Sequence, residues 1–261
     1  MKRIIVIALL IVLTLIVSLV AHMPARFALQ YIPMPRALVI QSVQGSVWQG
    51  SVQQVSWQGT SLGQVHWNIN PSQLLLGKAQ AEVLFGQGSA MGLRGRGVIG
   101  YSFSGAYAKE TIASLPAQFA VEQLNLPLPL DLEGQLEVSI TELAITDLDK
   151  SMPYCQQGLG SMVWSGNKAF TPIAELDLGP VVVNLSCQDN VISLNGEQGS
   201  EQVTAEFEAK LEVSANGQHQ YQASGWFKPE AAFPANLSSQ LKWLGNPNNQ
   251  GRYPLDFKGT L

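Results

Sequence analysis

The two cysteines are the residues whose type and spacing best fit a defined chemistry. Cys155 and Cys187 lie 32 positions apart, and the chain has no others. They could form a disulfide, remain as two buried thiols, or bind a metal ion. Metal binding fits least well, because no C-x-x-C pair and no nearby histidine completes a ligand set. The choice between disulfide and thiols depends on the compartment, since disulfides persist in oxidising surroundings.

A glycine-rich stretch matches a nucleotide-binding motif. Residues 95–100 read GRGVIG, the pattern G-x-G-x-x-G, which binds a pyrophosphate only where a strand leads into a helix. Here the next residues, 101–104, alternate in polarity as a strand does. The surrounding stretch, 86–105, is rich in glycine throughout. We therefore predict no nucleotide and no other cofactor.

The remaining polar residues give little support to catalysis or metal binding. His22, His66 and His219 are the only histidines, and none has a second histidine at ligand spacing. Catalytic triads assemble from distant segments, so spacing alone does not exclude one. Most polar residues, however, occupy alternate positions in strand-like segments. We predict a protein with no catalytic and no metal-binding residues, and therefore not an enzyme.

The charge pattern argues against nucleic-acid partners. The chain carries 15 basic and 19 acidic residues, a formal net charge of −4. Because Lys2 and Arg3 precede an apolar N-terminal run, the rest of the chain carries 13 basic and 19 acidic residues, a net of −6. No block of Lys or Arg could displace phosphate counterions. The 24 glycines, 14 prolines and low charge content also argue against a helical bundle.

The N-terminal segment predicts a membrane anchor. Residues 4–21 carry no charge, and as a helix they would span about 27 Å, close to a hydrocarbon core. A cleaved signal peptide is the alternative, but its apolar part is about 7–15 residues long and ends at a small-x-small site, which this run lacks. With Lys2 and Arg3 in front, we predict a cytoplasmic tip at 1–3, a transmembrane helix at 4–21 and an extracytoplasmic body at 22–261.

This placement bears on the cysteines, because both lie in the predicted extracytoplasmic body. An oxidising compartment favours a disulfide between Cys155 and Cys187. In the loop-entropy model such a bridge stabilises the fold by about 3–4 kcal/mol. Two buried thiols remain the alternative.

Alternation of apolar and polar residues predicts a mainly β body. The longest run, 203–213, alternates over eleven residues, and shorter runs do so at 65–70, 136–140 and 221–225. Alternation with one polar face favours antiparallel pairing. Only a few short helices are expected, at 70–77, at 109–115 before Pro116, and at 237–244.

Two phrases recur in the same order along the chain. GSVWQG at 45–50 is similar to GSMVWSG at 160–166, and PLDLEGQL at 129–136 is similar to PLDFKGTL at 254–261. We interpret them as two structural repeats, at about 36–136 and 155–261. Chance reuse of strand and turn phrases is the alternative.

The predicted body contains six tryptophans. Tryptophans in β proteins usually pack in the core or across strand pairs. The functional alternative is an apolar groove for a lipid tail or a partner protein. The six residues are Trp48, Trp57, Trp67, Trp164, Trp226 and Trp243.

Taken together, these features resemble the type II secretion system protein N family, also called general secretion pathway protein N. The resemblance rests on the basic tip, the anchor, the Pro-rich exit at 24–35, VQGSVWQG at 43–50, a cysteine on each side of the second Trp-x-Gly phrase, and GRYPLDFKGTL at 251–261. It covers essentially the whole chain. By motif match it assigns structural roles to Trp48, Gly50, Trp164 and Gly166, and to the pair Cys155 and Cys187.

The resemblance implies a single-pass inner-membrane protein with a periplasmic body similar to AsmA-like β-rich proteins, which are linked to lipid traffic. Such a protein would take part in export of folded periplasmic proteins across the outer membrane by contacting other machine subunits. The alternative is an envelope protein that binds or transfers lipid in an apolar groove. A filled core would favour the first function, and an open apolar trough would favour the second.

Overall fold

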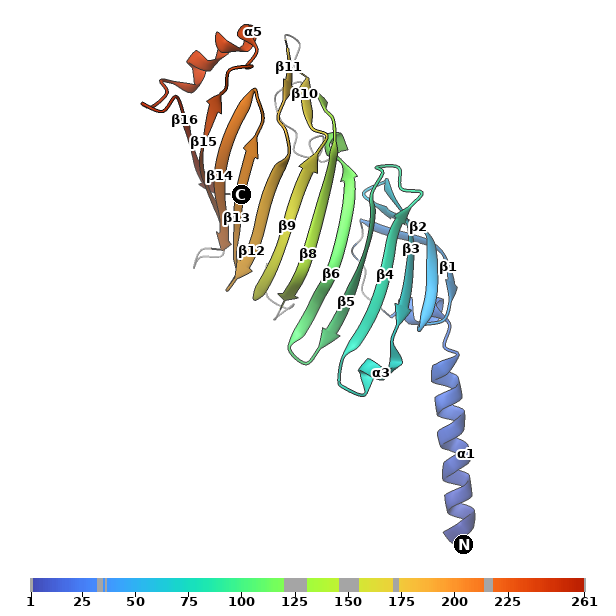
Figure 1. Ribbon diagram of the computed structural model, residues 1–261. Helices are drawn as coiled ribbons and strands as arrows, with labels where there is room; N and C mark the ends of the chain where they lie inside the picture. Colours follow the sequence, from blue (N-terminus) through green and yellow to red (C-terminus); the bar gives the residue numbers. More distant parts are fainter. Residues whose placement is uncertain are drawn as a thin grey trace.

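The computed structural model describes residues 2–31, 35, 37–119, 131–145, 155–170, 174–213 and 218–260 of the chain. An N-terminal helix, α1 (Lys2–Ala21), leads into one large antiparallel sheet whose long strands arch (Figure 1). A second, three-stranded sheet and a few short helices complete the described structure. The prediction of a mainly β, antiparallel fold is confirmed.

The large sheet has thirteen strands that follow one another across it almost in chain order. In spatial order they are β1 (Leu38–Gly45), β2 (Gln49–Trp57), β3 (Thr60–Ile69), β4 (Ala79–Gln87), β5 (Arg94–Ser102), β6 (Gly105–Pro116), β8 (Gln135–Ile145), β9 (Gln157–Ser165), β12 (Val181–Gln188), β13 (Val191–Gly199), β14 (Val203–Val213), β15 (His219–Pro229) and β16 (Tyr253–Thr260). Neighbouring strands are therefore joined mostly by local connections.

The smaller elements occupy the connections between these strands. The three-stranded sheet contains β7 (Asp131–Leu132), β10 (Lys168–Phe170) and β11 (Glu175–Asp177), with β10 in the middle. The short helices are α2 (Ala25–Leu29), α3 (Pro71–Leu74), α5 (Ala235–Ser238) and the 3-10 helix η1 (Gln240–Leu244).

Local sequence accounts for the regular strands. The alternating run 203–213 forms β14 and pairs with β15 along its full length. The turn between β12 and β13 contains only Asp189 and Asn190, whose φ angles are 49° and 65°. Two consecutive positive φ values define the type I′ turn that matches the twist of a hairpin, and Asp and Asn tolerate this conformation.

One expected helix is wrong. Residues 109–115 lie in β6, which pairs with β5 on one side and β8 on the other. A bulge at Glu110, with φ of 47°, keeps the strand in register with both neighbours. The β-branched pair Thr111 and Ile112 also favours a strand. Pairing on both sides therefore outweighs the helix-like start and the closing proline.

The other two helix predictions are confirmed as short elements. Asn70 caps α3, and its Oδ1 accepts the Ser72 backbone N–H at 3.1 Å. The segment predicted at 237–244 is divided between α5 and η1. Each is too short to cover a large part of the sheet.

The two proposed repeats occupy different kinds of element. The first Trp-x-Gly phrase, 45–50, spans the turn between β1 and β2, whereas the second, 160–166, lies largely within β9. Most of the phrase at 254–261 lies in β16, and residues 129 and 130 of its counterpart fall outside the described residues. The duplication stays a prediction.

The sheet has a thin core. Among the described residues only nine apolar side chains are buried, including Val52, Val183 and Val203. The accessible surface is 17383 Å² for a chain of 28.2 kDa, whereas a compact monomer of that mass exposes about 11,000 Å². The described residues therefore form an open sheet, and none of them builds a second layer across most of it.

Candidate functional site

One face of the large sheet is apolar across its full width. Residues directly opposite each other in an antiparallel pair share a face, so a row of partners can be followed from strand to strand. Thirteen consecutive partners, one from each strand, are all apolar or glycine: Val43, Val52, Val65, Phe85, Gly95, Ala113, Val138, Met162, Val183, Gly196, Phe207, Gly225 and Leu255. We call this the apolar face.

The opposite face is polar by the same criterion. The neighbouring row is polar at every strand except β4 and β6, where Leu84 and Ile112 occur. Its members are Gln44, Ser51, His66, Leu84, Arg96, Ile112, Ser139, Ser161, Asn184, Asn195, Glu208, Ser224 and Asp256. The sheet is thus amphipathic, with a polar face suited to water.

Much of the apolar face remains accessible. Ile99 is 49% exposed, Phe207 38% and Phe257 58%. These positions belong to β5, β14 and β16 and share the face with the apolar row. A row of apolar residues that crosses the sheet and stays partly exposed is typical of a surface that binds a partner, a lipid or a membrane. The apolar face is the candidate functional site.

At the end of the sheet opposite α1, which we call the far end, the described parts of two connections, which carry β7, β10 and β11, fold back over the apolar face. The Trp164 indole N–H donates to the backbone oxygen of Glu133 at 2.9 Å, just beyond β7. Gln198 is 8% exposed, and its side-chain amide donates to the backbone oxygens of Leu178 and, at 3.0 Å, Val203. These contacts hold the three-stranded sheet against this end.

Two exposed ion pairs also lie at the far end of the sheet. The Lys168 ammonium donates to the Glu175 carboxylate, joining β10 to β11. This hydrogen bond and the charge of Glu175 raise the pKa of Lys168 above its ordinary value. On β15, Lys228 donates to Glu230, which lowers the pKa of that carboxyl. Because these groups are exposed, such pairs orient the loops more than they stabilise them.

The other end, which we call the α1 end, is fixed to the N-terminal helix. The Trp48 indole N–H donates to the backbone oxygen of Val20 at 2.9 Å, and the Val47 N–H donates to Met23 at 2.9 Å. Pro24 and Ser46 form an isolated β-bridge beside them. The last turn of α1 is thus bonded to the turn between β1 and β2.

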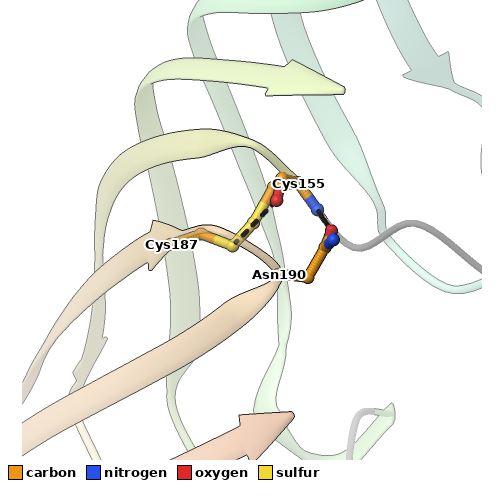
Figure 2. The surroundings of a disulfide bond; sticks show 3 residues. All are labelled: Cys155, Cys187 and Asn190. Carbon is orange, nitrogen blue, oxygen red and sulfur yellow. Dashed lines mark hydrogen bonds between the residues drawn. A yellow bond between two sulfur atoms is a disulfide. The ribbon is translucent and has the colours of Figure 1, made fainter. Parts of the chain in front are cut away.

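The two cysteines form a disulfide at the α1 end (Figure 2). Their Cα atoms are 6.3 Å apart, within the range that a bridge spans. Asn190 binds the same segment, because its backbone N–H donates to Cys155 O at 2.9 Å and its side chain accepts from Cys155 N at 3.4 Å. The bridge joins the start of β9 to the end of β12. It therefore closes a loop of the chain that contains β10 and β11.

The glycines of the two Trp-x-Gly phrases serve different local needs. Gly50 lies beneath the Trp67 ring, where any Cβ would collide with the indole. Gly166 has φ of 61° and turns the chain from β9 towards β10. Trp48 and Trp164 each donate an indole N–H to a distant carbonyl, one at each end of the sheet.

The polar face has a shallow hollow but no recognisable catalytic arrangement among the described residues. The hollow has a volume of about 910 Å³ and is lined by His66, Glu82, Arg96 and Glu110, among others. No group of three His, Cys, Asp or Glu in the described part of the chain could hold a metal ion. The GRGVIG motif lies in β5, which turns into strand β6 rather than a helix.

A second motif, GTSLG at 59–63, has the hydrolase pattern G-x-S-x-G. It lies in the turn between β2 and β3 and continues as a strand. A nucleophile elbow requires a strand, a sharp turn and then a helix. The motif therefore does not present Ser61 as such enzymes present theirs.

Comparison with known proteins identifies the family. The family model for type II secretion system (T2SS) protein N matches residues 36–256. The chain belongs to the type II secretion system protein N family. It is 44% identical, over the full length of both chains, to type II secretion system protein N of Vibrio cholerae serotype O1 (strain ATCC 39315 / El Tor Inaba N16961).

More distant members of the protein N family also align along most of their length. The protein of Aeromonas hydrophila is 31% identical over all of both chains, and that of Pectobacterium carotovorum subsp. carotovorum is 28% identical over 93% of this chain and 92% of its own. No solved structure matches the chain. The expected likeness to AsmA-like proteins therefore stays a prediction.

The described part of the chain contains one helix long enough and apolar enough to cross a membrane, Arg3–Ala21. An inner-membrane location is consistent with this helix and with the family. The motif residues indicated the two anchoring tryptophans and the disulfide. They gave no indication of the three-stranded sheet, because β7, β10 and β11 are two or three residues long and alternate too briefly to be recognised.

Proposed function

We propose that this chain is a non-enzymatic inner-membrane component of the type II secretion system. It takes part in export of folded periplasmic proteins across the outer membrane by contacting other subunits of the machine. The observation that carries this proposal is the family match over 36–256, which includes nearly the whole described sheet. The amphipathic sheet supports a contact role, because it offers a broad apolar surface and no assembled catalytic group among the described residues.

In this proposal α1 crosses the inner membrane, with residues 1–3 in the cytoplasm and 22–261 in the periplasm. Lys2 and Arg3 before the apolar segment favour this orientation. The disulfide between Cys155 and Cys187 suits an oxidising compartment. Hydrogen bonds from Trp48 and Val47 to the exit of α1 support a role as a firm tether for the sheet.

Gene deletion and complementation test the proposed role in export. Cells lacking the chain should retain a type II substrate in the periplasm, and the full-length chain should restore its release. A matched variant, in which a cleavable signal peptide replaces α1, should restore less because its sheet is no longer held at the membrane. Normal secretion in the deletion strain would contradict the proposal.

The open apolar face favours a second candidate function, lipid binding or lipid transfer in the envelope. A filled core would favour contact with other subunits, and an open apolar surface would favour lipid binding. The uncovered apolar face therefore supports this alternative. Native mass spectrometry of the purified full-length chain tests it. Co-purified phospholipid that is lost when Ile99 and Phe207 are both replaced by serine would support lipid binding, whereas a lipid-free chain would exclude stable binding.

A further inference from the structure

Two adjacent tips at the α1 end expose large apolar side chains. The connection from β3 to β4 carries Leu75 and Leu76, which are 89% and 69% exposed, and the turn from β5 to β6 carries Phe103, which is 98% exposed. The Phe103 ring lies against Gly77, so the two tips are in contact. Leu74, 43% exposed, belongs to the first tip, and Tyr101, 56% exposed, borders the second. We call Leu74, Leu75, Leu76 and Phe103 the apolar tips.

Strand register places these tips at the same end of the sheet as α1. Gln49 pairs with Asn68, so the turn between β1 and β2 lies beside the end of β3. Ala79 pairs with Tyr101, so the start of β4 lies beside the end of β5. In Figure 1, α3 lies near the level at which α1 joins the sheet. The tips and the exit of α1 therefore face the same way.

The orientation of the sheet relative to α1 is restrained. The bond from Trp48 to Val20 O, the bond from Val47 to Met23 O and the bridge between Pro24 and Ser46 all join the helix exit to β1 and β2. A helix attached through a single flexible residue would let the sheet turn any end towards the bilayer. Here the connection directs the α1 end towards it.

The composition of the tips suits a bilayer surface. Residues 70–78 and 101–107 contain no Asp or Glu, and Lys78 lies two residues after the last leucine, Leu76. An apolar cluster bordered by tyrosine and lysine is typical of segments that enter the headgroup region, where the ring and the ammonium stay near water. Phe27 and Tyr31, stacked edge to face at 5.3 Å and exposed next to α1, extend the same kind of surface.

We propose that the apolar tips insert into the periplasmic leaflet of the membrane that holds α1, as a second membrane contact. This rests on the proposed function only in that α1 spans the bilayer. With two contacts the sheet stands at a set angle to the membrane, and the membrane-side edge of its apolar face, which includes Ile99 and Tyr101, meets the lipid surface.

Site-specific fluorescence in proteoliposomes tests this contact. The full-length chain is reconstituted in vesicles of phosphatidylethanolamine and phosphatidylglycerol, with the native cysteines kept in their disulfide. Single variants Leu75→Cys and Phe103→Cys are labelled with an environment-sensitive dye. We expect blue-shifted emission and several-fold stronger quenching by nitroxide-bearing lipid than at the control Ala90→Cys, an exposed site in the loop between β4 and β5 at the far end.

A label at Leu13→Cys separates failure of this inference from failure of the anchor. Quenching at 13 with 75 and 103 no more quenched than 90 would overturn the second contact and leave the anchor intact. An unquenched label at 13 would overturn both. If 75 and 103 are exposed in vesicles but protected in cells that contain the other secretion subunits, the occupant is a protein and the membrane proposal is wrong.

Coupling between the two tips gives a second readout that does not depend on folding. Both side chains are so exposed that substitution removes little packing within the sheet. Adding Leu75→Glu to the chain labelled at Phe103→Cys should reduce quenching at 103 several-fold, since a carboxylate resists entry into the lipid. Adding Ala90→Glu at the far end, also at an exposed position, should leave quenching at 103 unchanged. Equal quenching in both double variants would overturn the inference.

Discussion

The two ends of the sheet treat their apolar side chains differently: the far end covers them, and the α1 end leaves some of them exposed. At the far end, β7, β10 and β11, in the described parts of two connections, lie over the apolar face, and Trp164 and Gln198 hold them there. At the α1 end, the connections near the helix are short and expose Leu75 and Phe103. An end surrounded by water must cover its apolar side chains, whereas an end next to a bilayer can leave them open.

Breaking the disulfide should have the largest effect, because it is the covalent link at the α1 end. Cys155→Ser should lower the free energy of unfolding by about 3–4 kcal/mol in the loop-entropy model. Denaturant unfolding of oxidised samples measures the loss. The wild-type chain in reductant should behave like the variant. An unfolding midpoint that reductant leaves unchanged would contradict a stabilising bridge.

Removing the polar anchor of the far end comes next. Gln198→Ala deletes both amide hydrogen bonds and leaves the Leu178 and Val203 oxygens without these donors. The expected cost is about 2–3 kcal/mol, measured by denaturant unfolding. Gln222→Ala, at an exposed position on the polar face, is the control and should change stability by no more than about 0.5 kcal/mol. Equal effects of the two variants would argue against the far-end cover.

The two tryptophans allow the ends to be compared directly. Trp164→Phe removes one hydrogen bond from the far end and should cost about 1 kcal/mol in sheet stability, with faster amide exchange around β7 and β10. Trp48→Phe removes a similar bond but should leave sheet stability nearly unchanged. Its effect should appear as faster exchange of the Val47 N–H at the helix exit. If both variants lower the stability of the sheet equally, the two tryptophan hydrogen bonds have the same role, and the two ends do not differ in this respect.

The smallest effect is expected from the exposed ion pair at the far end. Since Glu175 raises the pKa of Lys168, the pair stabilises the fold below the ordinary lysine pKa of about 10.5, and this contribution is lost as pH rises through the shifted value. Lys168→Met should lower Tm at pH 7 by less than about 2 °C. A clearly larger change would give the pair a structural role.

Sequence patterns predicted the parts of the fold that are locally determined. The helix at 4–21, the eleven-residue strand at 203–213 and the cap at Asn70 all depend on residues close to one another in the chain. The helix predicted at 109–115 was wrong because β5 and β8 pair with that segment from both sides. Such pairing depends on residues far away in sequence.

The candidate site was harder to predict for a related reason. Each strand shows its own alternation, but whether thirteen apolar residues fall on one row depends on register. Bulges between Val52 and Ser56 of β2, at Glu110 of β6 and between Ile140 and Glu142 of β8 alter the register without leaving a clear sequence signal. Alternation also cannot predict whether a second layer covers the apolar face, because the sequence alternates with the same period in a covered sheet and in an open one.

Photocrosslinking from neighbouring residues of β16 tests most directly whether the apolar face is the working surface. Phe257 lies on the apolar face and Lys258 on the polar face, and both are exposed. A photoreactive residue at 257, in cells assembling the secretion system, should give adducts with other machine subunits, while one at 258 should give few. Adducts that form equally from both positions, or only from 258, would contradict the account.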